Sequence, residues 1–227
     1  MASAKIYALP IAAMAAIVLA SNVAVQYPVF AEIGGLQLAD ILTFGAFTYP
    51  FAFLVTDLTN RRYGPRVARR VVYAGFAAAI VCSLVVPPLL YDLGLLGFST
   101  TADRLFRIAV ASGGAFLMAQ LLDIAVFNRL RQDSWWRAPA ASSLSGSVLD
   151  TVTFFTVAFA PLFVFLGAND GFALESARLL GVFSLEAPRW VSWAIGDFTV
   201  KLVIAVFALI PYRVIMQRFM PYRPQPV

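Results

Sequence analysis

Long apolar stretches of the sequence contain ionisable side chains, whose charge is costly there, and five of these are clear cases. At the centre of a bilayer a charged side chain costs at least about 2.5–3.5 kcal/mol on insertion scales, so such a group should face protein or water. Carboxylates in this setting can accept hydrogen bonds from a ligand, and a lysine can hold them or gate access to them. The five residues are Asp57, Asp123, Asp150, Asp197 and Lys201.

Asp150, Asp197 and Lys201 fall near the middle of their apolar stretches. Asp197 and Lys201 are four residues apart, so they can form an ion pair on one helix, which would have a structural role alone. Asp150 has no local partner and must be protonated, pair with Lys201 from the neighbouring stretch, or face water or a ligand. Because one lysine cannot fully neutralise both acids, the surplus of acid predicts a polar cavity inside the membrane.

Asp57 and Asp123 lie roughly 10 Å nearer to one end of their stretches, given the helical rise of about 1.5 Å per residue. Asp57 precedes Arg61 by four residues, which predicts an ion pair at a helix end with a structural or gating role. Asp123 has no base three or four residues away. Further candidates for a binding site are three amides and one ring, although interhelical hydrogen bonding and core packing also explain such residues: Asn22, Gln26, Gln120 and Phe154.

The composition shows which elements must position these residues. Hydrophobic residues make up 61% of the 227 residues and charged residues 13%, about half the charged share of a soluble domain. A membrane-crossing helix needs roughly 20 mostly apolar residues. Six stretches qualify, which predicts an all-α, polytopic membrane protein with residues 1–227 in one domain. The stretches are about 6–27, 38–59, 67–91, 105–130, 142–166 and 190–216.

Arginine residues indicate the orientation of these stretches in the membrane. The first stretch is expected to be an uncleaved helix and not a secretory signal, because its apolar core is long and no small-x-small site follows it. Basic residues are concentrated in alternate loops, which predicts that those loops and both termini are cytoplasmic. The basic residues are Arg61, Arg62, Arg66, Arg69 and Arg70 after the second stretch, Arg129, Arg131 and Arg137 after the fourth, and Arg213, Arg218 and Arg223 in the tail.

The last loop on the opposite side contains an amphipathic segment, residues 172–183. Its apolar residues recur at helical spacing, and Glu175 and Arg178 are three residues apart. This pattern predicts a short helix lying on the outer membrane surface, and a lid over an outward-facing site is the alternative.

Several residue types that catalysis and metal binding require are absent from the sequence. There is no histidine, and the single cysteine, Cys82, lies in an apolar stretch, so we expect no metal site and no intrachain disulfide. No glycine-rich nucleotide loop or nucleophile elbow is present, so we expect no cofactor and no enzymatic activity. The net charge of +5 lies in loops between apolar stretches, which favours membrane orientation over nucleic-acid binding.

Five segments together resemble the VUT family, also called the queuosine precursor transporter family. The resemblance extends from about Ser21 to Arg213, and its longest segment, 49–64, reads YPFAFLVTDLTNRRYG. The others, in order, are ARRVVYAGF at 68–76, QLLDIAVF at 120–127, LDTVTFF at 149–155 and GDFTVK at 196–201. One departure is Asn128, which follows the third of these segments where a histidine is expected in many relatives.

The resemblance implies a six-helix protein of the bacterial inner membrane whose fold is similar to the substrate-binding components of energy-coupling-factor transporters. It implies import of a purine-like precursor of queuosine, 7-cyano-7-deazaguanine or 7-aminomethyl-7-deazaguanine, and a secondary carrier is the expected type. The alternative is a substrate-binding component for a vitamin or nucleobase that works with an external ATPase module. A homo-oligomer stays open, and the only other expected partner is the lipid bilayer.

A deazaguanine presents a ring N–H and an exocyclic amine side by side, which match the two oxygens of one carboxylate. We expect that carboxylate among Asp150, Asp123 and Asp197, with Gln120, Asn22 and Gln26 as amide partners and Lys201 as the residue that holds Asp197 or gates access. Two rival classes are an intramembrane enzyme that acts on lipid and a structural membrane protein whose acids only join helices. Turnover of a lipid would be needed to support the first.

Overall fold

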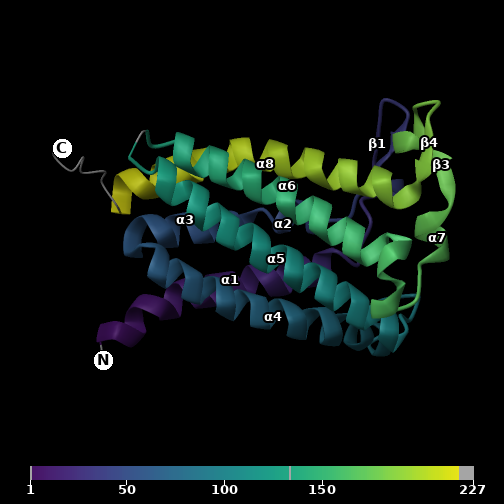
Figure 1. Ribbon diagram of the computed structural model, residues 1–227, viewed down its shortest axis with the longest axis horizontal. Helices are drawn as coiled ribbons and strands as arrows, with labels where there is room; N and C mark the ends of the chain where they lie inside the picture. Colours follow the sequence, from purple (N-terminus) through teal and green to yellow (C-terminus); the bar gives the residue numbers. More distant parts are fainter. Residues whose placement is uncertain (1, 133, 220–227) are drawn as a thin grey trace.

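The computed structural model describes residues 2–132 and 134–219, and this part of the chain is mostly helical. The longer helices lie side by side along the long axis of the molecule (Figure 1). They are α1 (Ala2–Ala24), α3 (Phe51–Tyr63), α4 (Pro65–Asp92), α5 (Ala102–Leu130), α6 (Arg137–Phe159) and α8 (Arg189–Phe219).

Shorter elements connect α1 to α3 and α6 to α8. The first connection holds the hairpin β1 (Glu32–Ile33) and β2 (Leu36–Gln37), then η1 (Leu38–Asp40) and α2 (Gly45–Thr48). The second holds η2 (Pro161–Leu166), α7 (Gly171–Leu174), η3 (Leu179–Gly181) and the hairpin β3 (Ser176–Arg178) and β4 (Glu186–Pro188).

Four helices among the described residues are long and apolar enough to cross a membrane. They are Ile6–Ala24, Pro65–Asp92, Ala102–Leu130 and Arg189–Arg218. They coincide with four of the six predicted stretches. The other two stretches, 38–59 and 142–166, are not single regular helices in the structure, and a proline lies at a break in each of them.

The stretch 38–59 is not one regular helix, because the chain before Phe51 turns and bonds to the segment that follows α1. The Phe44 N–H donates to the Tyr27 carbonyl at 3.0 Å, and the Val29 N–H donates to the Leu42 carbonyl at 3.1 Å. Pro50 follows α2 and has no N–H to donate to the carbonyl four residues earlier, so regular helix resumes only in α3. As a result α3 has 13 residues and presents Asp57 near its middle.

The stretch 142–166 changes from α-helix to a 3₁₀ turn at its far end. Ala160 is extended, with φ −68° and ψ 136°, because the ring of the following Pro161 disfavours helical backbone at the residue before it. The helix α6 therefore ends at Phe159, and the chain continues as the 3₁₀ turn η2. At its other end α6 begins earlier than predicted, at Arg137.

A buried arginine completes the broken end of α6. The last carbonyls of a helix have no partner within the helix. Arg107 of α5 is 1% exposed, and its guanidinium donates to the carbonyls of Val157 at 2.9 Å, Ala160 at 2.6 Å and Gly167 at 3.2 Å. It also donates to Asn169 Oδ1 at 3.0 Å. The sequence analysis did not single out Arg107.

Replacing Arg107 with methionine is expected to lower thermal stability in detergent. Three partly buried carbonyls would lose their charged donor at once, which costs about 3 kcal/mol, or a fall in Tm of roughly 6–12 °C. The matched control is Arg104→Met on the same helix, because Arg104 is partly exposed and pairs with Asp170 near the surface. Equal Tm values for the two variants would contradict the proposed role of Arg107.

The two ends of the helix bundle differ in charge. The start of α1 and the end of α8 lie at the same end of the bundle, together with the turn between α3 and α4 and the connection between α5 and α6 (Figure 1). The arginine-rich loops predicted from the sequence therefore lie at one end of the bundle. Arg223 lies outside the described residues. The opposite end carries the two hairpins, α7 and acidic residues that include Glu32, Asp170, Glu175 and Glu186.

The outer segment 172–183 is not the single helix that its pattern predicts. Helix covers only α7, and Ser176–Arg178 form a strand that pairs with Glu186–Pro188. Leu180 and Gly181 have φ of 53° and 75°, in the left-handed region that a right-handed helix cannot include. Glu175 pairs with Arg189 at 3.2 Å, which joins the segment to the start of α8.

The main apolar core lies between α1, α4 and α5. Met14, Val71, Val72 and Phe116 are fully buried in it or nearly so. A Cβ at Gly75 would lie 2.7 Å from Met14 Cγ and 2.9 Å from Phe116 Cζ, so glycine allows the close approach of these helices. The polar residues of the candidate site lie beside this core, on α3, α5, α6 and α8.

Candidate functional site

Asp150, Thr151, Asp197 and Lys201 form one buried polar group, called the lysine cluster below. Lys201 of α8 donates to Asp150 Oδ2 of α6 at 2.6 Å and pairs with Asp197 Oδ2 at 2.5 Å. The Thr151 hydroxyl donates to Asp197 Oδ2 at 3.0 Å. The Lys201 ammonium also lies 5.4 Å from the centre of the Tyr49 ring.

The lysine cluster joins α6 to α8 and leaves none of its charged groups without a partner. The three residues near mid-span meet, and the single lysine contacts both acids. Two carboxylates against one ammonium leave one surplus negative charge if all three are ionised. Because the groups satisfy one another and are buried, this arrangement suits a stable connection between two helices more than a free ligand site.

A second buried group, called the carboxyl cluster below, lies on α3 and α5. Asp57 and Asp123 are 1% and 0% exposed, and their carboxyl groups are within hydrogen-bonding reach of one another. Asp57 Oδ1 accepts a hydrogen bond from the Ser142 hydroxyl of α6 at 3.2 Å. The Thr56 hydroxyl donates to Gln120 Oε1 at 2.5 Å. The cluster consists of Thr56, Asp57, Asn60, Gln120, Asp123 and Ser142.

Polar atoms without a partner are concentrated around the carboxyl cluster. Within residues 2–132 and 134–219, no hydrogen-bond partner is present for either oxygen of Asp123, either amide atom of Asn60, Gln120 Nε2 or the Tyr212 hydroxyl. More than about 90% of buried polar groups in proteins have a partner, so each exception requires an explanation. These atoms include both donors and acceptors, which is the mixture that a heterocyclic ligand with N–H and carbonyl groups would satisfy.

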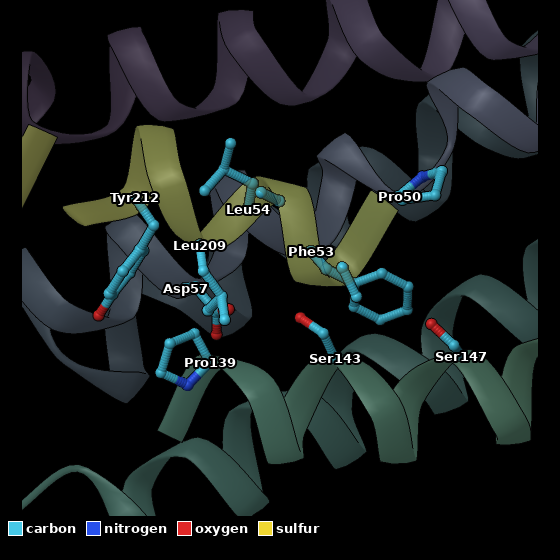
Figure 2. A pocket seen from close by; sticks show the side chains of 11 residues that line it. Pro50, Phe53, Leu54, Asp57, Pro139, Ser143, Ser147, Leu209 and Tyr212 are labelled. Carbon is cyan, nitrogen blue, oxygen red and sulfur yellow. The ribbon is translucent and has the colours of Figure 1, made fainter. Parts of the chain in front are cut away.

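A narrow pocket reaches Asp57 from between α3, α6 and α8 (Figure 2). Asp57 and Ser143 extend into it from opposite helices, and Phe53 and Tyr212 lie on its walls. It has room for about one water molecule, so a purine-sized ring requires the three helices to separate. The full lining is Pro50, Phe53, Leu54, Asp57, Pro139, Ser143, Ser147, Ala205, Ala208, Leu209 and Tyr212.

Asp57 and Arg61 contact different groups, although the sequence predicts an ion pair between them. Asp57 lies against Ser142 and Asp123, as described above. Arg61 Nη1 donates to the Arg131 carbonyl at 2.7 Å, and its guanidinium lies 5.9 Å from the centre of the Phe127 ring. Arg61 thus connects α3 to the segment that follows α5.

Three of the candidates from the sequence lie outside both clusters. Asn22 Nδ2 donates to the Val18 carbonyl of its own helix at 2.9 Å, and Asn22 Oδ1 accepts from Ser83 at 3.0 Å. Gln26 Nε2 donates to the Asn22 carbonyl at 3.3 Å. Phe154 packs edge-on against the Phe155 ring at 5.1 Å, inside an aromatic group near the outer end.

Two groups in and around the carboxyl cluster were not among the candidates from the sequence. Asn60 follows Asp57 by three residues, and this spacing, which places both on one helix face, could have identified it. Tyr212 lies far along the chain in an apolar stretch, and no local pattern marks it. Only the packing of α8 against α3 brings its ring to the pocket.

Comparison with known proteins identifies relatives over most of the chain. Residues 43–216 match the model of a family described as putative vitamin uptake transporter. The chain is 38% identical to the queuosine precursor transporter of Escherichia coli (strain K12) over 199 residues, which cover 86% of this chain and 79% of the relative. It is 34% identical to the probable queuosine precursor transporter of Haemophilus influenzae over 205 residues, with the same coverage of both chains.

No solved structure matches the chain. The family model covers well over half of the sequence and includes both clusters, and the two relatives agree with it over a similar range. The resemblance seen in the five sequence segments is confirmed by these matches. The chain therefore belongs to the family of putative vitamin uptake transporters.

Proposed function

We propose that this protein imports 7-cyano-7-deazaguanine or 7-aminomethyl-7-deazaguanine across the bacterial inner membrane as a secondary carrier. Three relatives support the proposal by name, because they are called queuosine precursor transporters or probable ones, and two of them are 38% and 34% identical to this chain. The absence of a nucleotide-binding loop in the sequence agrees with a carrier that does not itself hydrolyse ATP.

In this proposal the chain crosses the membrane six times. The four long apolar helices are joined by α3 with the folded segment before it, and by α6 with η2 after it. Broken helices at membrane depth are tolerated where they are buried in protein or line a cavity. The arginine-rich end is placed in the cytoplasm with both termini, in line with the excess of basic residues in cytoplasmic loops.

The unpartnered polar atoms of the carboxyl cluster are the observation that carries the assignment of the substrate site. Asp123 would accept the ring N–H and the exocyclic amine of the deazaguanine through its two oxygens. The amide donors of Gln120 and Asn60 would meet the ring carbonyl. Gln120 is already oriented for this role, because its Oε1 accepts from Thr56 and its Nε2 has no other described partner.

The lysine cluster has a gating role in this proposal. Lys201, Asp150 and Asp197 hold α6 against α8 on one side of the pocket. Because the pocket is too narrow for the substrate, loading requires these helices to move, and the cluster is the strongest connection that such a movement would strain. Asp150 and Asp197 are thus positioned to control access and not to contact the substrate.

Uptake in cells tests the proposal directly. A strain that cannot make 7-cyano-7-deazaguanine and lacks its own importer should regain queuosine-modified tRNA at low external precursor only when this gene is expressed. The measurement is accumulation of the labelled precursor together with the modified fraction of tRNA. Failure of rescue despite normal amounts of protein in the membrane would contradict the proposal. Rescue that needs a co-purifying ATPase would contradict the secondary-carrier part.

A further inference from the structure

We propose that Asp57 and Asp123 share one proton, and that this proton is the ion whose entry drives import. The inference deepens the proposed function, on which it rests, by naming the coupling ion and the residues that carry it. It depends on the position of the two carboxyl groups, on the hydrogen bonds they make and on their distance from any ion-pair partner.

The two carboxyl groups are buried next to one another without a cation between them. Asp57 and Asp123 are at most 1% exposed and lie within hydrogen-bonding reach of each other. Asp57 accepts from Ser142, with Ser143 beside it, and Ser142 also lies close to the Asp123 carboxyl group, although no donor among the described residues makes a well-oriented hydrogen bond to either Asp123 oxygen. The ion pairs within 4.0 Å that the described residues form include neither acid.

The charged and titratable groups around the pair come from three elements. From α3, Arg61 directs one nitrogen to the Arg131 carbonyl. The side chain of Arg131 lies in the segment after α5, and Tyr212 of α8 lies close enough to interact electrostatically with both acids and both arginines. From α6 the pair meets only hydroxyl groups, those of Ser142 and Ser143.

Two ionised carboxylates this close repel each other strongly in a buried setting, so one proton between them is the stable arrangement. With that proton on Asp57, the Asp57 hydroxyl can donate to Asp123, which stays ionised. An ionised Asp123 is what the two N–H donors of the substrate require. The proton on Asp57 therefore favours substrate binding at Asp123, and by linkage the substrate favours retention of the proton.

This linkage produces cotransport when the site alternates between the two sides. Facing outward, Asp57 takes a proton from water and Asp123 binds the neutral heterocycle. Facing inward, the Asp57 O–H bond breaks, the proton passes to cytoplasmic water, and the substrate leaves a site that has become less favourable for it. No bond of the substrate changes, and one proton enters with each molecule.

A proton fits this site better than a sodium ion does. A metal ion needs several oxygen ligands around it at once. In the cluster the Gln120 oxygen already accepts from Thr56, and one Asp57 oxygen accepts from Ser142. A proton needs only the two carboxyl groups, which are already adjacent.

The test uses the purified full-length protein in liposomes and labelled 7-cyano-7-deazaguanine. Wild-type protein should accumulate the label at least tenfold when the outside is acidic, in choline or sodium buffer alike. Asp57→Asn, which imitates the protonated state, should lose accumulation of the label while it still exchanges internal for external substrate. Asp92→Asn, an exposed residue at the far end of α4, is the control and should accumulate normally.

Binding provides a second measurement that does not depend on the gradient. The Kd of wild-type protein should rise by up to tenfold per pH unit once the pair loses its proton, whereas the Kd of Asp57→Asn should stay constant. If Asp57→Asn does not fold, substrate added to wild-type protein in weak buffer should still take up protons, seen with a pH-sensitive dye.

Four results would overturn the inference. They are accumulation by wild-type protein that depends on sodium and not on pH, accumulation by Asp57→Asn, a wild-type Kd that does not vary with pH, and no proton uptake on substrate binding. If wild-type protein neither binds nor exchanges the precursor, the proposed function itself fails. That result is separate, because it appears without any gradient.

Discussion

Replacing Asp123 with asparagine is expected to weaken binding of 7-cyano-7-deazaguanine at least a hundredfold. In the proposed site the two Asp123 oxygens accept two N–H groups of the substrate. Hydrogen bonds to a charged group contribute about 1.5–3 kcal/mol each, and a loss of about 3 kcal/mol already corresponds to more than a hundredfold in Kd. The asparagine amide would also direct its own N–H₂ group at a substrate donor, which adds an unfavourable contact.

The measurement is equilibrium binding of labelled precursor to purified protein, with thermal unfolding recorded to show that the variant is folded. Asp123→Asn should unfold at or above the wild-type temperature, because it removes one of two adjacent buried acids. Asp92→Asn again provides a control at an exposed acid. An affinity of Asp123→Asn within threefold of wild type would exclude Asp123 as the residue that binds the substrate edge.

Replacing Lys201 with methionine is expected to have the largest effect on stability. Lys201 contacts both Asp150 and Asp197, so its loss leaves the buried Asp150 and the partly exposed Asp197 without their cation. Removing one partner of a buried ion pair costs about 3–5 kcal/mol. We expect a fall in Tm of roughly 6–20 °C in detergent, or no folded protein at all.

A matched series separates this electrostatic cause from a general loss of packing. Asp197→Asn alone should cost much less, because Lys201 keeps its contact with Asp150 at 2.6 Å. The triple variant Lys201→Met, Asp150→Asn, Asp197→Asn removes all three charges and should recover most of the stability that Lys201→Met loses. A triple variant no more stable than Lys201→Met would refute the electrostatic explanation.

The sequence predicts the long apolar helices well and the broken ones poorly. Apolar length alone identifies α1, α4, α5 and α8, because nothing interrupts their hydrogen bonding strongly enough to end them. By composition alone, the stretches 38–59 and 142–166 indicate membrane-crossing helices just as strongly. Their breaks depend on where Pro50 and Pro161 fall and on tertiary contacts, such as the Phe44 N–H to the Tyr27 carbonyl, that composition does not encode.

The candidate site divides in the same way. The high cost of placing a charge in an apolar stretch is enough to identify five candidates from the sequence. Each of them lies in one of the two clusters: Asp57, Asp123, Asp150, Asp197 and Lys201. Which acid lies beside which is a matter of helix packing. The contact of Asp150 with Lys201 is one of the alternatives that the sequence leaves open for Asp150. The position of Asp57 next to Asp123 follows from the contact of α3 with α5, and no local sequence pattern indicates it.

The narrow pocket between α3, α6 and α8 also bears on how the cell keeps its ion gradients. A passage with room for about one water molecule cannot hold the unbroken file of water along which ions leak. This pocket therefore provides no path for an ion leak, and the resting protein is expected to add no measurable conductance to a planar membrane.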